Sequence, residues 1–267
     1  MPRVKWEDTH DGRILIFFPL TGTVIGALMG AWLFACGMLA IPVTAAALVM
    51  IAIPILITGG IHLDGFIDTC DARHSYKERE EKLRILSDPH VGAFGVIRLA
   101  LYLLLLIAAM IVILQYGDTS MIMMPILMMT FSRTLSGWTS VAWPGAKKDG
   151  MLRSVAGDPT ADEEDAGDRP SDDNGTGSRL DTAGRQSIVR GILLAEAVLT
   201  GAGMMLTDPV IGLVIVLSGI AVTVYYRYMS AKEFGGVTGD LAGWFLCVTE
   251  LFCAICVAAY FLIGGLL

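Results

Sequence analysis

The chain has 267 residues, of which 54% are hydrophobic and 17% are charged. A soluble domain of this length carries more charge and fewer apolar residues, so the composition indicates a polytopic membrane protein. The formal net charge of −7 is concentrated in one stretch and no basic stripe is present, which argues against a nucleic-acid partner.

Apolar runs that are long enough, or nearly so, to cross about 30 Å of hydrocarbon recur along the chain. They predict an all-α, polytopic integral membrane protein with about seven transmembrane helices. We expect residues 1–267 to form a single membrane-embedded domain. The predicted spans are Ile14–Cys36, Ile41–Ile57, Val96–Gln115, Met121–Val141, Ile188–Leu206, Pro209–Tyr226 and Leu241–Ile263.

The basic residues predict how these helices are oriented. With the amino terminus inside, 18 of the 19 lysines and arginines lie in inner segments and the outer loops have none. This distribution follows the positive-inside rule. It predicts a cell-membrane protein whose amino terminus and catalytic loops are cytoplasmic and whose carboxyl terminus is outside.

The first inner loop, residues 60–95, carries the main candidate site. Asp64, Asp68 and Asp71 are spaced by four and three residues, so on a helix their carboxylates share an arc of about 60°. Carboxylates this close repel one another unless a cation lies between them, and an oxygen-only ligand set favours magnesium, manganese or calcium over zinc. A solvated helix face is the plain alternative. Because the acids directly follow a membrane-length apolar run, we prefer a magnesium site, which indicates phosphate chemistry.

Two further residues of this loop are candidates for acid–base chemistry. A second short helix ends at Asp88-Pro89, and we expect it to fold back beside the three aspartates. Asp88 would then add a fourth metal ligand or act as the base for a hydroxyl proton. His62 is another candidate base. On a continuous helix it lies about 160° from Asp64, so it serves only if Gly59-Gly60 turns it back.

The second inner loop contains an acidic stretch at residues 157–186, with nine acidic residues against three arginines. It is rich in Gly, Asp, Ser, Thr and Pro and has few large apolar side chains. Such a segment cannot bury enough surface to offset its ordering entropy. We therefore predict a disordered acidic insert, tolerated in a loop rather than regulatory.

The third inner loop, residues 235–240, directly precedes the last predicted span and contains three glycines. Glycines permit close backbone approach and expose amides, which suits a phosphate or a nucleotide. The loop lies on the same side of the membrane as the aspartates. We therefore predict Gly236, Thr238, Gly239 and Asp240 as substrate-binding residues.

Two arginines complete the candidate site. Arg73 lies off the face of the aspartates, and we expect it to reach a substrate phosphate from the side. Arg133 lies within the fourth predicted span, where an ionisable group is costly and usually functional. It either receives a phosphate oxygen in a cavity open to the cytoplasm or forms a structural ion pair with Glu250 or Glu196.

Six segments of the chain together match the pattern of one family. They are Phe17-Phe18-Pro19-Leu20, His62-Leu63-Asp64-Gly65-x-x-Asp68-x-x-Asp71, Asp88-x-x-x-Gly92-x-Phe94-Gly95, Ser132-Arg133, Asp149-Gly150 and Gly235-Gly236-x-Thr238-Gly239-Asp240. Through these segments, which are spread in order over nearly its whole length, the chain resembles the cobalamin synthase family, also called adenosylcobinamide-GDP ribazoletransferase. The acidic insert and Pro89-His90 depart from the pattern of that family.

The resemblance implies a transferase of cobalamin (vitamin B12) biosynthesis. In such an enzyme the ribose hydroxyl of α-ribazole, or of its 5′-phosphate, attacks the corrinoid-side phosphorus of adenosylcobinamide-GDP and GMP leaves. Asp64, Asp68 and Asp71 would hold Mg²⁺, with Asp88 as a further ligand or as the base. The expected partners are these two substrates and the lipid bilayer. Whether the chain forms a homo-oligomer is left open by the sequence.

Two other classes of protein stay open on the sequence alone. A CDP-alcohol phosphotransferase has a similar Asp-Gly-x-x-Ala-Arg opening, although Asp68 stands where that motif has alanine. A divalent-cation transporter with the three aspartates along its path is less favoured. Such a protein would place acids at mid-membrane on several spans, and here only Glu196 and Glu250 qualify.

Overall fold

The computed structural model describes residues 13–117, 122–146 and 175–264, and it describes side chains for residues 14–117, 122–146 and 184–264. These parts of the chain are helices joined by short turns. The elements are η2 (Arg13–Phe17), α1 (Phe18–Leu39), α2 (Val43–Thr58), α3 (Ile61–His74), α4 (Arg79–Ile85), α5 (Ala93–Tyr116), α6 (Met124–Ala142), α8 (Gly175–Thr207), α9 (Pro209–Met229), η6 (Ser230–Phe234) and α10 (Gly239–Gly264).

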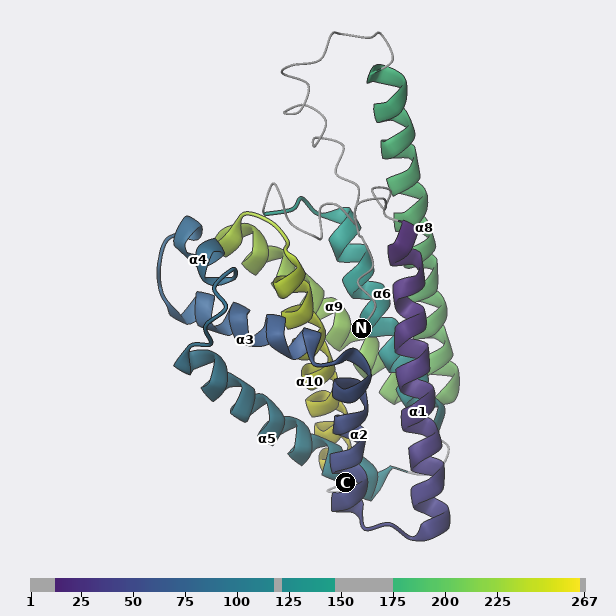
Figure 1. Ribbon diagram of the computed structural model, residues 1–267. Helices are drawn as coiled ribbons and strands as arrows, with labels where there is room; N and C mark the ends of the chain where they lie inside the picture. Colours follow the sequence, from purple (N-terminus) through teal and green to yellow (C-terminus); the bar gives the residue numbers. More distant parts are fainter. Residues whose placement is uncertain (1–12, 118–121, 147–174, 265–267) are drawn as a thin grey trace.

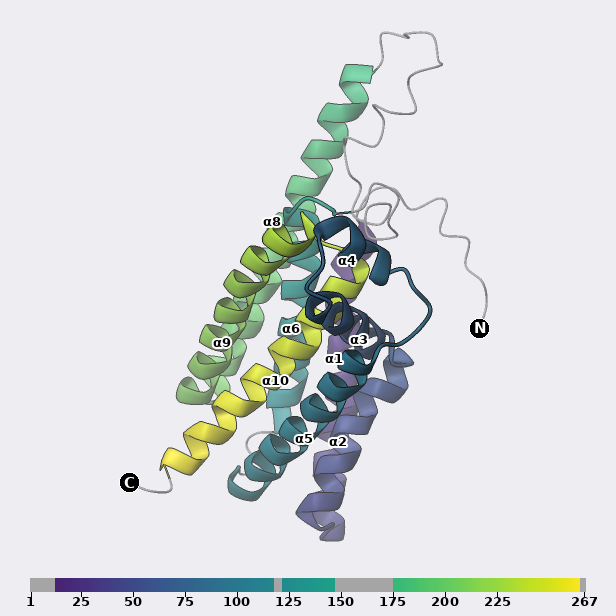
Figure 2. The same cartoon turned by 90° about the vertical axis from the view of Figure 1, so that its left-hand side faces the viewer.

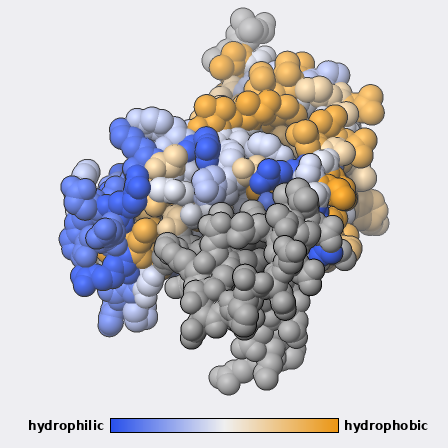
Figure 3. Space-filling model, turned by 90° about the horizontal axis from the view of Figure 1, so that it is seen from above, coloured by the Kyte–Doolittle hydropathy of each residue, from blue (hydrophilic) through white to orange (hydrophobic). Residues whose placement is uncertain are grey.

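The long helices form a bundle in which successive helices run in opposite directions (Figures 1 and 2). In chain order these helices are α1, α2, α5, α6, α8, α9 and α10. As a result α3, α4, η6 and the start of α10 lie at one end of the bundle, which we name the α3 end. Seen from this end, hydrophilic residues gather on the side where α4 lies, whereas apolar residues cover the opposite flank (Figure 3).

The all-α, polytopic membrane fold is confirmed, but the predicted count of seven spans is not. Among the described residues five helices are long and apolar enough to cross a membrane, or six if α2 and α3 count as one bent span. α2 has 16 residues and is therefore about 24 Å long, shorter than a hydrocarbon core of about 30 Å. α6 is less apolar than α1, α2, α5, α9 and α10, because serine, threonine and arginine line its buried face.

α8 overlaps the segment that was predicted to be disordered. It begins at Gly175 and so includes residues 175–186 of that segment, and the rest of the segment lies outside the described residues. Each residue added to an existing helix gains one hydrogen bond, so a helix can continue past its apolar part into a polar sequence. The start of α8 projects beyond the neighbouring helices (Figure 1).

Glycines bring α1 and α6 together. Gly22, Gly26 and Gly30 of α1 recur every four residues; the first two face the backbone of α6, and Gly30 faces the backbone just before it. A β-carbon on Gly30 would lie 2.9 Å from the carbonyl oxygen of Ile122. Small residues at this spacing allow membrane helices to pack backbone to backbone. α1 is therefore held against α6 at a distance that larger side chains would not permit.

The main core lies between α3, α5, α9 and α10. Tyr226, Phe234, Leu241 and Phe245 are fully buried there. The rings of Tyr226 and Phe245 stack with their centroids 4.7 Å apart. Because buried aromatic rings contribute much of the packing energy of a core, this cluster fixes α10 in the bundle and, with it, the helix that crosses α3.

Candidate functional site

α3 begins after a sharp turn of the chain. Gly59 and Gly60 have φ values of 64° and 81°, in the left-handed region that glycine adopts without a steric penalty. These two residues allow the chain to turn by 92° between α2 and α3. α3 then runs unbroken from Ile61 to His74, across the end of the bundle.

The middle of α3 crosses the start of α10 at backbone contact. A β-carbon on Gly65 would lie 2.7 Å from the carbonyl oxygen of Asp240 and 2.8 Å from its Cα. Only glycine permits this approach, since neither contact involves a side chain that could move away. Gly65 lies between Asp64 and Asp68 in sequence. The crossing therefore brings both aspartates next to the first turn of α10.

The first turn of α10 is capped and open to a ligand. Thr238 is buried, and its Oγ1 accepts a hydrogen bond of 3.2 Å from the backbone N–H of Leu241. Gly239, the first residue of the helix, has no atom within 4 Å of the place that a β-carbon would take. A helix N-terminus carries N–H groups without intrahelical partners and attracts anions. Thr238, Gly239 and Asp240 thus form the start of this helix, and their binding of a substrate phosphate stays a prediction.

Gly236 is used for packing instead. Its N–H donates a hydrogen bond of 3.1 Å to the carbonyl oxygen of Ser230, and a β-carbon on it would collide with the carbonyl oxygen of Pro144. The next residue, Val237, forms an isolated bridge with Gly145 after α6. The amide of Gly236 is therefore not available to a substrate, which corrects its predicted binding role.

Asp71 binds the start of α5. Its two carboxylate oxygens accept hydrogen bonds from the backbone N–H groups of Gly92 and Gly95, each of 2.8 Å. Charge-assisted bonds of this kind are favourable at a helix N-terminus. A β-carbon on either glycine would collide with the carboxylate. The chain after α4 thus returns to α3 at Gly92 and Gly95, where Asp71 anchors it.

Asp88 lies at an exposed turn, with its side chain 52% exposed. Its Oδ1 accepts a hydrogen bond of 2.9 Å from the backbone N–H of His90 and lies 2.7 Å from Nδ1 of the same residue. These two interactions, the backbone one first, hold the pKa of Asp88 below its ordinary value. A carboxylate with a lowered pKa takes up a proton less readily, so Asp88 is a poor general base in this conformation.

The predicted cluster of carboxylates does not form. In the described ranges no group of three or more His, Cys, Asp or Glu side chains could hold a metal ion. Asp71 is bound to α5 and Asp88 lies at the exposed turn. Asp64, which is exposed, and Asp68, which is half-buried, remain together on α3. Mg²⁺ is commonly held by one or two carboxylates together with substrate phosphates, so this pair fits that ion.

His62 faces a different part of the molecule from Asp64. It lines a cavity of about 580 Å³ that is bounded mainly by apolar side chains of α1, α2, α5, α6 and α10. Its ring packs edge-on against Phe18, with the centroids 6.2 Å apart. Because α3 is continuous from Ile61, the glycine turn does not bring His62 back to the aspartates. The predicted role of His62 as a base required such a turn, so the structure does not support that role.

Arg133 lines the same cavity and forms the ion pair that the sequence left open. Its guanidinium pairs with Glu250 of α10 and donates a hydrogen bond of 2.9 Å to Ser132. The side chain is 1% exposed. A charge buried within a membrane bundle is costly unless it is paired. Glu250 is therefore confirmed as the partner, and a phosphate contact for Arg133 is not supported.

Arg73 lies on the opposite side of α3 from Asp64, since nine residues at 100° each amount to a rotation of about 180°. Its Nη2 lies 3.1 Å from a carboxylate oxygen of Glu233 and donates a hydrogen bond of 2.8 Å to Tyr225. Lys82 of α4 pairs with the same glutamate at 2.9 Å. Arg73 thus ties α3 to η6 and α9, and the structure does not place it beside the aspartates.

Two important residues were not singled out from the sequence. Gly65 sets the α3–α10 contact, and its position between two aspartates on a helix was the available signal, because an interior glycine often marks a close backbone approach. Glu233 joins Arg73 and Lys82, yet it is distant from both in sequence and no spacing could have indicated it.

Comparison with known proteins identifies the family. The model described as Cobalamin-5-phosphate synthase matches residues 1–166 and 167–258. The adenosylcobinamide-GDP ribazoletransferase of Lachnoclostridium phytofermentans is 32% identical over 257 residues, which is 96% of this chain and 87% of that protein. Proteins of the same name from Geotalea daltonii and Clostridium perfringens are 31% and 29% identical, over 98% and 94% of this chain and 91% and 88% of their own. No solved structure matches the chain. The chain therefore belongs to the cobalamin-5-phosphate synthase family of cobalamin-biosynthesis transferases, which confirms the resemblance seen in its motifs.

Proposed function

We propose that this chain joins adenosylcobinamide-GDP to α-ribazole or to its 5′-phosphate. The ribose hydroxyl loses its proton and bonds to the corrinoid-side phosphorus, while the bond from that phosphorus to the oxygen of the GMP group breaks. Adenosylcobalamin or its 5′-phosphate forms and GMP leaves. The relatives are named as ribazoletransferases of adenosylcobinamide-GDP, and they cover most of this chain.

The observation that carries the proposal is the contact between Gly65 and Asp240. It brings the part of α3 that carries Asp64 and Asp68 against the N-terminus of α10, which supports a site shared by these two carboxylates and that helix end. Carboxylates favour a hard cation and a helix N-terminus favours an anion. A diphosphate with its bound cation presents both charges within a few ångströms, so the crossing of α3 and α10 suits this class of substrate.

We propose Mg²⁺ as the cation, held by Asp64 and Asp68. When bound, this ion neutralises charge on a diphosphate and favours an in-line attack. Thr238 keeps the first turn of α10 in place through its hydrogen bond to Leu241. The open position at Gly239 leaves room for a phosphate oxygen near the N–H groups of that turn.

The test is turnover by membranes that contain the full chain. We expect adenosylcobinamide-GDP, α-ribazole and Mg²⁺ to yield GMP and a cobalamin, and a chelator to stop the reaction until Mg²⁺ is restored. Asp64→Asn and Asp68→Asn should each lower the rate by about a thousandfold, because stabilisation by a metal ion is worth several kcal/mol. Glu81→Gln, which neutralises an acid on α4, is the matched control and should keep the rate.

Two results would contradict the proposal. A correctly inserted chain that forms no cobalamin, or that instead transfers a CDP-linked head group to an alcohol, would exclude the ribazoletransferase reaction. Near-normal rates in both aspartate variants would leave the reaction in place but remove the metal site.

We also propose that the α3 end faces the cytoplasm. The support is the distribution of Lys and Arg, of which 18 among 19 fall in segments predicted to be inside. The alternating directions of the long helices agree with this, since the described parts of these segments meet at the α3 end. A reporter fused after Leu267 should then be detected outside the cell, and a cytoplasmic signal would contradict this orientation.

A further inference from the structure

A pocket separate from the aspartate face lies between α3, α5, η6 and α10. It has a volume of about 670 Å³. Its lining residues on α3 include Phe66, Cys70 and Arg73, which lie about 120° to 180° around the helix from Asp64. The pocket is therefore on the far side of α3 from the carboxylates of the proposed active site, and a ligand bound in it would be independent of the proposed function.

The pocket carries an excess of positive charge. Arg73, Lys82, Arg98 and Lys232 line it, and Glu233 is the acidic residue among the described residues that do so. Glu233 pairs with Arg73 and with Lys82. That arrangement leaves Arg98 and Lys232 without a carboxylate partner in the described part of the chain.

The hydrogen-bond partners of these two cations are neutral, and the one nearby carboxylate, Glu233 beside Lys232, already pairs with Arg73 and Lys82. Nη2 of Arg98 lies 2.7 Å from Nε2 of His74, whose Nδ1 lies 2.7 Å from the carbonyl oxygen of Cys70. A ring that donates from Nδ1 and accepts at Nε2 is uncharged. Lys232 donates a hydrogen bond of 2.8 Å to the hydroxyl of Tyr228. Both cations are thus placed by neutral groups and keep donors for an anion.

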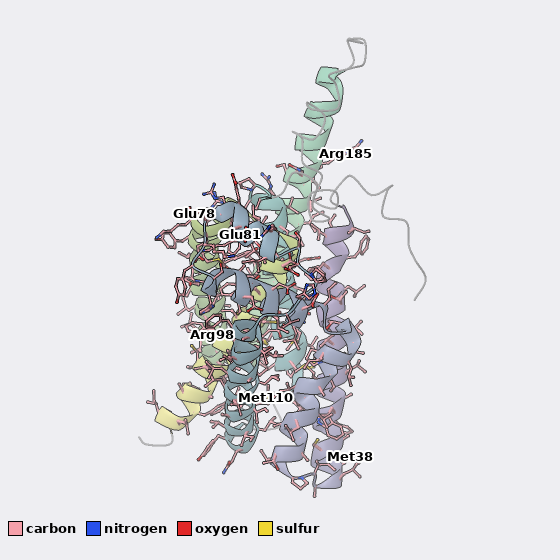
Figure 4. The ribbon with its side chains drawn as sticks, turned by 60° about the vertical axis from the view of Figure 1, so that its left-hand side comes forward. Met38, Glu78, Glu81, Arg98, Met110 and Arg185 are labelled. Carbon is pink, nitrogen blue, oxygen red and sulfur yellow. The ribbon has the colours of Figure 1, made fainter. Side chains whose placement is uncertain are left out.

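The opposite end of the pocket is apolar and faces lipid. Leu101 and Leu105 of α5 are 43% and 41% exposed, and Val248 and Leu251 of α10 form the facing wall. Both helices are candidate membrane spans. Leu105 lies seven residues, or about 10 Å, further along α5 than Arg98. Figure 4 shows Arg98 between Glu81 of α4 above it and Met110, further along α5, below it.

Aromatic residues mark the same level of the bundle. Tyr76 and Tyr228 are 87% and 58% exposed and line the pocket together with Trp244. Tyrosine and tryptophan are enriched where a membrane protein passes from hydrocarbon to water. The cationic end of the pocket therefore lies at the membrane surface and the apolar end reaches into the bilayer.

We propose that this pocket binds one phospholipid with an anionic headgroup. Arg98 and Lys232 contact the phosphate, and an acyl chain lies along the wall formed by Leu101, Leu105, Val248 and Leu251. Basic pockets between transmembrane helices are suited to anionic headgroups. A free phosphate would use the cations but would leave the apolar wall without an occupant, so the shape and the charge together favour the lipid.

Lipid retention by the full chain in detergent tests the proposal. The purified protein is mixed with equal amounts of phosphatidylglycerol and phosphatidylcholine of the same acyl chains and is examined by native mass spectrometry. We expect wild type to retain one phosphatidylglycerol. The Arg98→Gln/Lys232→Gln variant should lose this preference by about 25-fold, since each basic residue near an anionic lipid contributes about fivefold. Each single variant should lose this preference by about fivefold, so the test stays valid if the double variant folds poorly.

Matched variants separate a specific pocket from surface charge. Lys77→Gln/Arg84→Gln removes two cations that pair with Glu81 on α4, at the same end of the bundle, and should keep the preference. Leu105→Trp fills the apolar wall, leaves both cations in place and should also reduce retention. An unchanged preference in Arg98→Gln/Lys232→Gln, or an equal loss in the α4 variant, would overturn the proposal.

Two further outcomes would assign the pocket to another occupant. If inorganic phosphate raises the thermal stability of the lipid-free protein as much as phosphatidylglycerol does, and Leu105→Trp has no effect, the pocket is a site for phosphate and the lipid assignment is wrong. If native mass spectrometry shows a dimer that is lost in the Arg98→Gln/Lys232→Gln variant, a second copy of the chain covers the pocket and the lipid assignment is also wrong.

Discussion

The two sides of α3 are held in place in different ways. On the side of Asp64 the helix touches α10 through its backbone at Gly65, where the nearest atoms belong to the backbone of Asp240. On the side of Arg73 the helix is tied to η6 and α4 by charged side chains that converge on Glu233. The contact at Gly65 therefore uses no charged side chain, whereas the charge of Arg73 on the second side is engaged in the fold.

Gly65→Ala is the strongest test of this difference between the two sides of α3. A methyl group there must push α3 away from Asp240, because the atoms it meets belong to the backbone. A displacement of about 1 Å at a reacting group can cost about a hundredfold in rate. We expect a loss of about that size in kcat/KM, measured with adenosylcobinamide-GDP in membranes. Gly37→Ala in α1, where the same methyl meets no atom within 4 Å, is the control. Equal rates in the two variants would show that the crossing does not position the site.

Asp71→Asn sharpens the comparison, because it tests whether Asp71 anchors α5 or binds the metal. An amide offers one acceptor oxygen where the carboxylate offers two, so one of the N–H groups of Gly92 and Gly95 loses its partner at a cost of about 1–3 kcal/mol. We expect a lower midpoint of thermal unfolding, faster hydrogen exchange at these amides, and a loss of about tenfold in rate as the start of α5 moves.

Asp208→Asn is the matched control for that variant. Asp208 accepts hydrogen bonds from the N–H groups of Val210 and Ile211 at the start of α9, at the other end of the bundle. One oxygen, Oδ1, accepts both bonds, and asparagine keeps such an oxygen, so this variant should change stability little and leave turnover intact. If Asp71→Asn instead abolishes turnover as Asp64→Asn should, with unfolding unchanged, Asp71 is a metal ligand as the sequence first predicted.

Spacing in the sequence identified the helices and which residues share a face, but it could not tell what covers each face. The spacing of Asp64, Asp68 and Asp71 correctly indicated one helix, and the placement of Arg133 in a span correctly raised Glu250 as a partner. The use of Asp71 depends on amides more than twenty residues away, and no periodicity encodes such a contact. Arg73 was correctly expected to lie off the face of the aspartates, but its partner Glu233 on η6 could not be found from spacing for the same reason.

Arg73→Gln should have the smallest effect of these changes. The side chains of Arg73 and Glu233 are each 22% exposed, and Lys82 remains as a partner of the glutamate. Partly exposed ion pairs contribute about 1 kcal/mol or less, so we expect a modest fall in the unfolding midpoint and a rate within about threefold of wild type. Arg73→Lys keeps the charge but loses the planar guanidinium group. Its unfolding midpoint should lie between those of wild type and Arg73→Gln. A loss of turnover comparable with that of Asp64→Asn, at unchanged stability, would return Arg73 to the substrate and would mean that the two sides of α3 act on the same ligand.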